Sequence, residues 1–288
     1  MPFAAYIIYL TKRPFRPPDI LDPVRCFKGF SYNKHVDQEV SAKLLALNSQ
    51  FYQTLGQEFS ATRARLQPGA LRVLADITQN ASILDIGCGN GELAKELLRG
   101  KFSGRYVGLD SSPVMLKEAS SDLILDSAGA STPELHFLLA DLASPTWDQT
   151  PVFNQHALEG IHFDYTLAFA VLHHLPGVEL RRRVLAKIRR MLKPNGRFVH
   201  SEWQFLNSPR LQNRLQSWEE IGLTSAQVDA GDYLLDWRRG GHGLRYVHHF
   251  TESELSEVAA ETGFIIEETF LSDGERGKLG LYQVWQPV

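Results

Sequence analysis

The chain has 288 residues, of which 43% are hydrophobic and 22% charged, a composition typical of globular proteins and unlike that of disordered or fibrous chains. Two cysteines, Cys26 and Cys88, are too few for a disulfide framework or a cysteine zinc site, so we expect no metal centre and a reducing, cytoplasmic location. The formal net charge of −3 argues against general nucleic-acid binding, although residues 171–250 contain thirteen Lys and Arg against seven Asp and Glu, a local net charge of +6.

The first 38 residues differ from the rest of the chain. Four prolines between positions 14 and 23 forbid a long helix there, so we interpret residues 1–38 as an N-terminal appendage that is flexible in part. The apolar run from Phe3 to Leu10 is too short to span a bilayer, and we expect no membrane anchor. Residues 38–58 and 68–78 then show the apolar spacing of helices.

From residue 82 onward, strand patterns and helix patterns alternate. We expect strands at 82–86, 105–110, 135–140, 163–169, 196–203, 264–270 and 279–285, and helices at 91–99, 113–120, 178–192 and 252–262. Such alternation predicts parallel strands joined by crossover helices. The predicted fold class is therefore α/β: a doubly wound, mostly parallel, seven-stranded Rossmann-like sheet with an antiparallel edge strand. Residues 39–288 form this domain, and residues 204–250 form a substrate-side insertion after the fifth strand.

The first strand leads into a glycine-rich loop. Residues 83–94 read ILDIGCGNGELA, with Gly87, Gly89 and Gly91 at every second position and Asp85 before them. Glycines let the backbone turn sharply and lie against a ligand, and the helix that follows offers free N–H groups. Dinucleotide enzymes use the spacing G-x-G-x-x-G to hold a pyrophosphate. The spacing G-x-G-x-G after an acid favours a cationic ligand without phosphate.

Three further strand ends carry polar side chains. The second strand ends in Asp110, an acid suited to ribose hydroxyls, and the third in Asp141, an acid suited to an adenine amino group. The fourth ends in the pair His173 and His174. Each acid also has a structural interpretation as a helix N-cap or turn residue. Their order and spacing favour an adenosyl ligand.

With these motifs the chain resembles the class I S-adenosylmethionine-dependent methyltransferases over about residues 48–288. The resemblance implies S-adenosyl-L-methionine as the cofactor, with its methionine end on the glycine loop, its ribose at Asp110 and its adenine at Asp141. It also implies that residues 170–173 face the methyl group. The cofactor-binding residues implied in this way are Asp85, Gly87, Gly89, Asn90, Gly91, Asp110, Ser111, Asp141, Leu142 and Ala170.

The methyl acceptor is a separate question. Methyl transfer from a sulfonium is a direct displacement, so an acceptor that is an ionised carboxylate needs no base, only a cation or hydrogen-bond donors to orient it. The candidate catalytic residues are His173, His174, Arg245 and His248. Neighbours on an extended segment point in opposite directions, so we expect one of His173 and His174 to face the site, without choosing between them. Arg245 and His248 could instead be hydrogen-bonded ties between the insertion and the sheet.

A narrower resemblance concerns the tRNA wobble-uridine carboxymethyl methyltransferases. The segments that carry it are FSATR at 59–63, AVLHH at 170–174, GDYLLDW at 231–237 and RYVHHFT at 245–251. It implies tRNA as a partner, Arg63 close to the cofactor's carboxylate, and Arg245 and His248 close to the acceptor. A small activator subunit, which some family members need, is a further possible partner. The family's Val-Pro-Trp appears here as Leu-Asp-Trp at 235–237.

Two alternatives to a tRNA acceptor stay open at this point. The first is a small-molecule O-, N- or C-methyltransferase, acting for example on a carboxylic acid, a phenol or a quinone. The second is a protein of this fold that has lost catalysis and serves as a binding subunit. Retention of Asp85, Asp110, Asp141 and all three loop glycines argues against the second alternative.

Overall fold

The computed structural model describes residues 36–61, 65–123, 133–152, 158–274 and 276–288. Almost all of the predicted N-terminal appendage, and Arg63, therefore lie outside the described residues. Every described residue belongs to one compact unit, Lys34–Val288. Within the described ranges, no helix combines the length and the apolar character that a membrane span requires.

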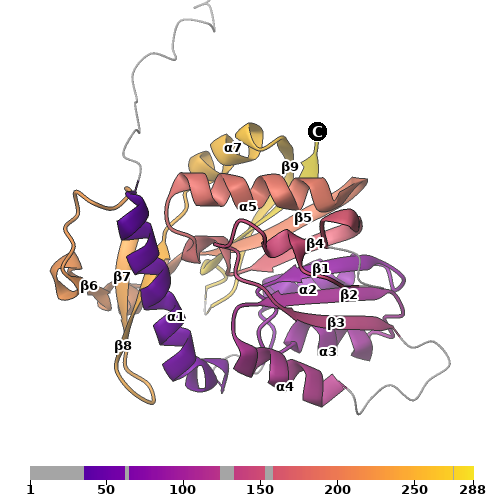
Figure 1. The fold of residues 1–288 in the computed structure, drawn as a ribbon, viewed down its shortest axis with the longest axis horizontal. Helices are drawn as coiled ribbons and strands as arrows, with labels where there is room; N and C mark the ends of the chain where they lie inside the picture. The colour runs from indigo at the N-terminus through magenta and orange to yellow at the C-terminus, as the bar shows by residue number, and fades with distance from the viewer. Residues whose placement is uncertain (1–35, 62–64, 124–132, 153–157, 275) are drawn as a thin grey trace, which may run out of the picture. The chain divides into compact units, whose positions relative to one another are not determined.

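A seven-stranded sheet with the order β3-β2-β1-β4-β5-β10-β9 forms the centre of this unit (Figure 1). Its strands are β1 (Ser82–Ile86), β2 (Arg105–Asp110), β3 (Glu134–Leu139), β4 (Phe163–Phe169), β5 (Leu192–Trp203), β9 (Phe264–Ser272) and β10 (Gly280–Pro287). Strands β1 to β5 are parallel, and β10 runs antiparallel to both β5 and β9. The predicted fold class is confirmed, with the antiparallel strand lying one place inside the edge strand β9.

Helices cover both faces of the sheet (Figure 1). The α-helices of the described ranges are α1 (Gln38–Ala61), α2 (Pro68–Ala75), α3 (Glu92–Arg99), α4 (Pro113–Leu123), α5 (Val178–Met191), α6 (Pro209–Gln212) and α7 (Glu252–Glu261). One apolar core joins the sheet to α5 and α7, and a second joins the other face to α2 and α3. Along β1, Ile83 packs in the second core, whereas Leu84 and Ile86 pack in the first. A strand buried on both faces in this way is typical of parallel sheets.

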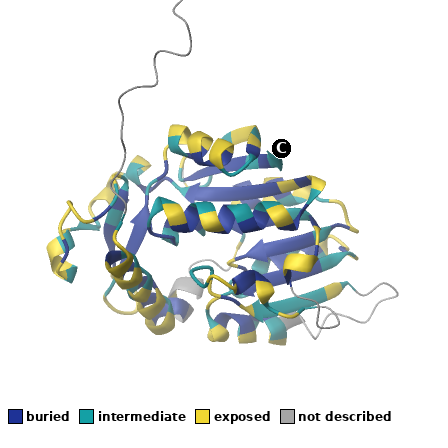
Figure 2. Cartoon of the chain, turned by 45° about the horizontal axis from the view of Figure 1, so that its top comes forward, coloured by how far each residue is buried: buried dark blue, intermediate teal, exposed yellow. Residues whose placement is uncertain are grey.

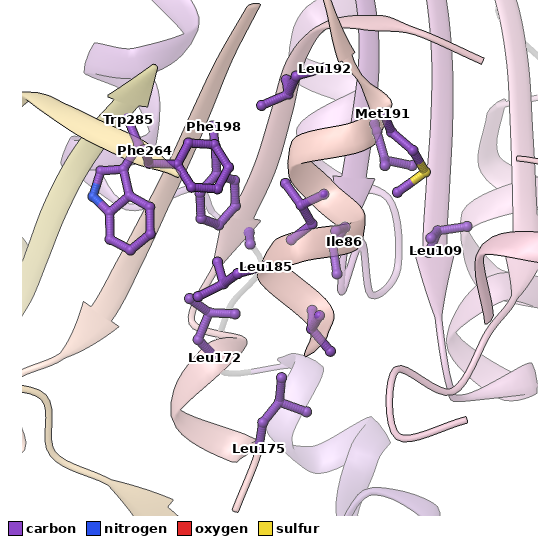
Figure 3. Packing of buried hydrophobic residues seen from close by; sticks show 14 of the residues in the cluster. Ile86, Leu109, Leu172, Leu175, Leu185, Met191, Leu192, Phe198, Phe264 and Trp285 are labelled. Atoms are coloured by element: carbon purple, nitrogen blue, oxygen red, sulfur yellow. The ribbon is translucent and has the colours of Figure 1, made fainter. Parts of the chain in front are cut away.

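The first core shows why α5 is a helix. Its apolar residues Leu180, Val184, Leu185, Ile188 and Met191 recur at helical spacing, and all are buried. Figure 3 shows Leu185 and Met191 of this helix among the side chains of the sheet. Figure 2 shows the central strands as mostly buried, while the helices expose their outer sides.

The insertion after β5 contains a small sheet that the sequence analysis did not predict. Its antiparallel strands are β6 (Leu215–Gln216), β7 (Asp232–Trp237) and β8 (Gly243–His248), and α1 packs on β8 (Figure 1). Gly240 and Gly241, both at positive φ, form the turn between β7 and β8. Two strand-like runs separated by five residues that include glycines indicate a hairpin. The tryptophans and glycines of this region interrupt the pattern, and the segment had been interpreted only as an insertion.

Strand β5 also begins earlier than predicted, at Leu192 and not at Gly196. Its pairing with β4 jumps from Phe163 opposite Leu192 to Tyr165 opposite Arg197. The predicted turn at 193–195 is therefore an irregularity inside the strand. The carboxyl end of β5, which carries site residues, is at Trp203, as predicted.

Candidate active site

A pocket of about 650 Å³ opens at the carboxyl ends of the parallel strands, where the strand order reverses between β1 and β4. Such a crevice is the usual ligand site of open α/β sheets. Its walls come from the loops after β1 to β4, from the end of β5 and from α1. Its described lining contains one Arg, Arg65, and six acids: Asp85, Glu92, Asp110, Asp141, Glu202 and Asp273. This acid-rich lining fits a cationic ligand.

The three loop glycines serve different purposes. All have positive φ, at +74° for Gly87, +55° for Gly89 and +77° for Gly91. A Cβ atom at Gly87 would lie 2.5 Å from Val171, and one at Gly91 would lie 3.0 Å from Ala119. At Gly89 a Cβ atom would meet nothing within 4 Å, and Gly89 lines the pocket. Packing therefore requires the outer two glycines, whereas the space beside Gly89 lets a ligand lie against the main chain.

Asp85 is a buried carboxyl group in the wall of this pocket, with 3% of its surface exposed. Tyr106 on β2 donates a hydrogen bond to Oδ2 of Asp85. Burial is the main cause that raises the pKa of Asp85; the Tyr106 hydrogen bond opposes the rise, the charge of Asp110 adds to it, and the resulting pKa is about 7. A bound cation would favour the ionised carboxylate and so reverse this effect.

Asp110 lies at the end of β2 and also lines the pocket. Its Oδ2 accepts a hydrogen bond from the backbone N–H of Gly89 at 2.9 Å, and its Oδ1 accepts one from Ser112 at 2.8 Å. Burial raises the pKa of Asp110 despite these bonds. A positively charged ligand is therefore expected to stabilise its ionised form as well.

The remaining predicted cofactor residues lie along the same wall. Asn90, Ser111, Asp141, Leu142 and Ala170 all line the pocket. Asp141 also holds its own turn, because its Oδ1 accepts a hydrogen bond from the backbone of Ala143 at 2.9 Å. Asp141 therefore fits both interpretations, because it stabilises its own turn and also lines the pocket. Arg63 lies outside the described residues, and its predicted role stays a prediction.

Ala170 adopts a strained backbone conformation at the end of β4, with φ at +59°. Its N–H is held by the carbonyl oxygen of Ser201 at 3.0 Å and by the Ser201 hydroxyl at 3.2 Å. Non-glycine residues rarely adopt positive φ, and such strain concentrates at functional sites. The strained turn directs the chain into the 3₁₀ helix η4 (Leu172–His174), which carries both histidines.

The structure separates the two histidines. His174 lines the pocket, where its Nε2 lies 2.9 Å from the hydroxyl of Tyr52 and its Nδ1 lies 3.3 Å from the carbonyl oxygen of Tyr246. His173 is 1% exposed and does not line the pocket. Its Nδ1 lies 3.0 Å from Oε2 of Glu202, behind the pocket wall. His174 is therefore the member of the pair that faces the site.

The structure does not bring Arg245 to the pocket wall. Its side chain is buried, and its guanidinium lies 4.7 Å from the ring of Trp203, 5.6 Å from Phe51 and 5.9 Å from Trp237. Such distances are those of cation–π contacts. Trp203 itself lines the pocket. Arg245 therefore supports the pocket wall through Trp203, and its predicted position close to the acceptor stays a prediction.

His248 is likewise placed away from the pocket. It is 1% exposed, with Nδ1 at 2.6 Å from Asp232 of β7 and Nε2 at 2.8 Å from Glu254 of α7. Arg181 of α5 joins the same buried cluster through a 3.0 Å contact with Glu254. These contacts agree with the alternative of a tie between the insertion and the helices, and the predicted position of His248 close to the acceptor stays a prediction.

Several residues that line the pocket were not predicted from the sequence. Asn48 and Tyr52 come from α1, and Glu202 and Trp203 come from the end of β5. Tyr52 lies in the segment 38–58, which the apolar spacing predicted only to be a helix. No local signal marks Tyr52 as a site residue, because the position of α1 at the pocket depends on its packing on β8, a strand far away in the chain.

These residues fit S-adenosyl-L-methionine. Gly89 leaves open space at the main chain, and the pKa values of Asp85 and Asp110 are raised in a way that a bound cation would offset. The pocket volume lies within the range of about 300–1,000 Å³ common for small-molecule sites. The fold and site together define a class I S-adenosylmethionine-dependent methyltransferase. Among the described residues, no group of three or more His, Cys, Asp or Glu side chains could hold a metal ion.

Residues 59–269 match a family described as a methyltransferase domain, and the chain belongs to this methyltransferase family. The cofactor of the enzyme is S-adenosyl-L-methionine. The chain is 27% identical over 216 residues to a putative methyltransferase of Encephalitozoon cuniculi, a match that covers 74% of this chain and 85% of the relative. A sterol 24-C-methyltransferase of Kluyveromyces lactis is 30% identical over 76% of this chain and 50% of its own length.

A third relative is a tRNA (carboxymethyluridine(34)-5-O)-methyltransferase of Saccharomyces cerevisiae, 27% identical over 48% of this chain and 42% of its own length. The chain thus matches about half of this relative and of the sterol enzyme. Among solved structures, a methyltransferase of Methanosarcina mazei has a TM-score of 0.56 at 21% identity and covers 77% of this chain and 98% of its own. The magnesium protoporphyrin IX methyltransferase of Synechocystis has a TM-score of 0.54 at 16% identity, covering 85% of this chain and 97% of its own. These similarities establish the fold.

Proposed function

We propose that the enzyme methylates the carboxylate of a carboxymethyl group on the wobble uridine of a tRNA. The observation that carries this proposal is a set of pocket-lining residues outside the glycine loop. Among them, Tyr52 and His174 carry hydrogen-bonding groups, Trp203 has an aromatic ring, and Arg65 adds a cation. A carboxylate requires only such donors and a cation, while an unpaired base can stack on an aromatic ring.

The comparisons and the sequence support the same acceptor class. Relatives from Saccharomyces cerevisiae and Arabidopsis thaliana bear the name tRNA (carboxymethyluridine(34)-5-O)-methyltransferase, at 27% and 24% identity. The segments at 231–237 and 245–251 that resemble that family form most of the hairpin on which α1 packs. By this argument the hairpin belongs to the acceptor side of the enzyme.

A small-molecule acceptor is the second candidate, and the surface charges favour it. Much of the positive charge between residues 171 and 250 is paired: Arg182 with Glu261 at 2.7 Å, Arg197 with Glu267 at 2.6 Å, and Lys193 with Asp164 at 2.8 Å. Arg181 and Lys187 are buried. The insertion exposes three further arginines that could contact phosphates, Arg210, Arg238 and Arg239, of which Arg238 also pairs with Asp236 at 2.5 Å.

Methyl-labelled S-adenosylmethionine tests the proposal. The purified chain is incubated with total tRNA or with a metabolite extract, each with and without a cell extract that could supply an activator subunit. Label in tRNA that alkali releases, as expected for a methyl ester, supports the proposal. Label only in small molecules contradicts it and favours the second candidate.

The salt dependence of tRNA binding provides an independent test. A tRNA that contacts the exposed arginines of the insertion releases counterions, so its affinity should fall steeply as salt increases. Replacing Arg238 and Arg239 by alanine should reduce the slope of log affinity against log salt concentration by about the contribution of two phosphate contacts. The double replacement of Arg72 and Arg99, on the distant helices α2 and α3, is the matched control. An affinity that is independent of salt would count against a tRNA substrate.

A further inference from the structure

Asp273 lies in the turn between β9 and β10 and lines the pocket. The predicted cofactor acids Asp85, Asp110 and Asp141 lie at the ends of β1, β2 and β3, whereas β10 and β9 come after β4 and β5 in the sheet order. Because β10 runs antiparallel to both β5 and β9, strand β9 ends at the same edge of the sheet as the parallel strands. The turn that follows β9 therefore borders the half of the pocket beyond β4, away from these three acids.

Two hydrogen bonds hold the carboxyl group of Asp273 in place. The backbone N–H of Gly69 in α2 donates to Oδ1 at 2.9 Å, and the hydroxyl of Tyr282 in β10 donates to Oδ2 at 2.7 Å. Burial raises the pKa of Tyr282, and the charge of Asp273 raises it further, so the phenol keeps the hydrogen that it donates. The backbone of Asp273 has φ of +69°, a conformation that Asp and Asn adopt more readily than most other residues. The carboxyl group therefore has a fixed position.

These two bonds leave acceptor capacity on Asp273. A carboxylate has about four lone-pair sites, two on each oxygen, and donates no hydrogen bond. Among the described residues, Gly69 and Tyr282 are the hydrogen-bond partners of this side chain. Asp273 is partly exposed and lines the pocket. Its structural role as a tie between α2 and the turn therefore uses only part of its capacity, and the remaining lone pairs can accept a hydrogen bond from a ligand.

The carboxyl group of Asp273 lies beside Trp203. Gly280 of β10 pairs directly with Trp203 of β5, and side chains at directly opposed positions of antiparallel strands lie on the same face. A Cβ atom at Gly280 would lie 2.5 Å from Oδ2 of Asp273 and 2.8 Å from the ring of Tyr282. The carboxyl group thus occupies the space that a side chain at position 280 would need, on the face that carries Trp203. Asp273, Gly280 and Trp203 all line the pocket.

We infer that Asp273 accepts a hydrogen bond from the edge of the planar ring that carries the methyl acceptor, and so selects a ring with a donor at that edge. This inference rests on the proposed function and deepens it, because the donor of a uracil ring is its N3–H. A ring with a lone pair at N3, such as cytosine, would place acceptor against acceptor and bind more weakly. Asp273 takes no part in the methyl transfer itself, and its contact determines specificity.

Two nucleoside probes test this contact without turnover: 5-carboxymethyluridine and its N3-methyl derivative, which lacks the donor. Their binding to the protein in complex with S-adenosylhomocysteine is measured by titration calorimetry. The wild type should bind the first probe about 10–100-fold more tightly, since a hydrogen bond to a charged group is lost with the second. In Asp273→Asn the side chain suits the positive φ and keeps an oxygen for Gly69, but an NH₂ group replaces the other oxygen. This variant should bind the two probes with nearly equal affinity.

Asp76→Asn is the matched control, because Asp76 is exposed and does not line the pocket, and it should keep the preference of the wild type. The wild-type comparison needs no variant to fold. Equal affinity of the wild type for both probes, or binding of neither, would overturn the inference. A preference that persists in Asp273→Asn would also overturn it, because the N3-methyl group would then act by its size alone.

The tRNA labelling experiment separates this inference from the proposed function. Label in tRNA together with equal binding of the two probes would refute only the role of Asp273. A preference that depends on Asp273, without label in tRNA, would refute only the tRNA acceptor. A purely structural role of Asp273 predicts that Asp273→Asn weakens the binding of both probes by the same factor and leaves their ratio unchanged, which would again overturn the inference.

Discussion

The backbone N–H of Gly89 donates a hydrogen bond to Oδ2 of Asp110 at 2.9 Å, and this bond ties the glycine loop to the end of β2. The N–H of Ser112 binds the other carboxyl oxygen at 2.8 Å. Asp110 thus holds the loop in place and also lines the pocket that the loop borders. Its carboxylate therefore contributes both to the shape of the cofactor site and to its charge.

Replacing Asp110 by alanine should lower the affinity for S-adenosylmethionine by at least about 10-fold, since a hydrogen bond to a charged group contributes about 1.5–3 kcal/mol. Isothermal titration calorimetry measures this change. Asp110→Asn keeps one accepting oxygen for the loop, so its affinity for S-adenosylmethionine should fall less than that of Asp110→Ala. Glu134→Gln, on exposed β3, is the control that removes an acid away from the pocket. An unchanged Kd for Asp110→Ala would remove this residue from the cofactor site.

Asp85 should make both cofactor binding and stability depend on pH. Its pKa in the folded protein, about 7, lies above the unfolded value of 3.8, so the folded state loses stability as the pH rises from about 4 to 7. Asp85→Asn removes this penalty and keeps an acceptor for Tyr106. The variant should be more stable than the wild type above pH 7, by up to about 4 kcal/mol, and equal to it near pH 4. Urea unfolding of both proteins at several pH values measures the difference in their free energies of unfolding and shows whether it has the expected sign.

The same carboxyl group should make the affinity of the wild type for S-adenosylmethionine increase between about pH 6 and pH 8, because the ionised form attracts a cation. Asp85→Asn should bind more weakly and show no such increase. Titration calorimetry at each pH, in buffers of different ionisation enthalpy, also counts the protons released on binding. A wild-type affinity that is flat across this range would contradict the raised pKa.

The glycine loop offers a matched pair of substitutions. Gly89→Ala places a methyl group in open space at φ of +55°, so it should cost about 1 kcal/mol of stability but lower cofactor affinity at least about 10-fold. Gly87→Ala adds a 2.5 Å clash with Val171 and should cost about 2–4 kcal/mol. Thermal unfolding and calorimetry together separate the two effects. Full cofactor affinity in Gly89→Ala would show that no ligand lies beside that residue.

The placement of His248 predicts a structural phenotype. His248→Ala would leave the buried Asp232 and the partly buried Glu254 without one partner each, at a cost of about 2–4 kcal/mol in stability. Its affinity for S-adenosylmethionine should stay unchanged, because His248 does not line the pocket. Urea unfolding measures the loss. A variant with full stability and a raised KM for the acceptor would instead restore His248 to the acceptor site.

Much of the fold and of the cofactor side could be predicted because the signals are local. The strands at 82–86, 105–110 and 163–169 have the bounds that their apolar runs predicted. Gly87, Gly89 and Gly91 all adopt positive φ, as their spacing in a sharp turn requires. Residues at the carboxyl ends of parallel strands meet at one edge whatever the details of packing, so Asp85, Asp110 and Asp141 all line one pocket.

The acceptor side depended on contacts between segments far apart in the chain. Sequence by itself determined the sheet, the glycine loop and the acids that follow its strands, because each follows from residues within a few positions of one another. Only the tertiary structure decided that His174 faces the pocket and His173 lies behind it, that α1 brings Tyr52 to the site, and that Arg245 and His248 are buried beside it. Those positions are set by how α1 and the insertion pack on the end of the sheet, and such packing leaves no periodic or local pattern in the sequence.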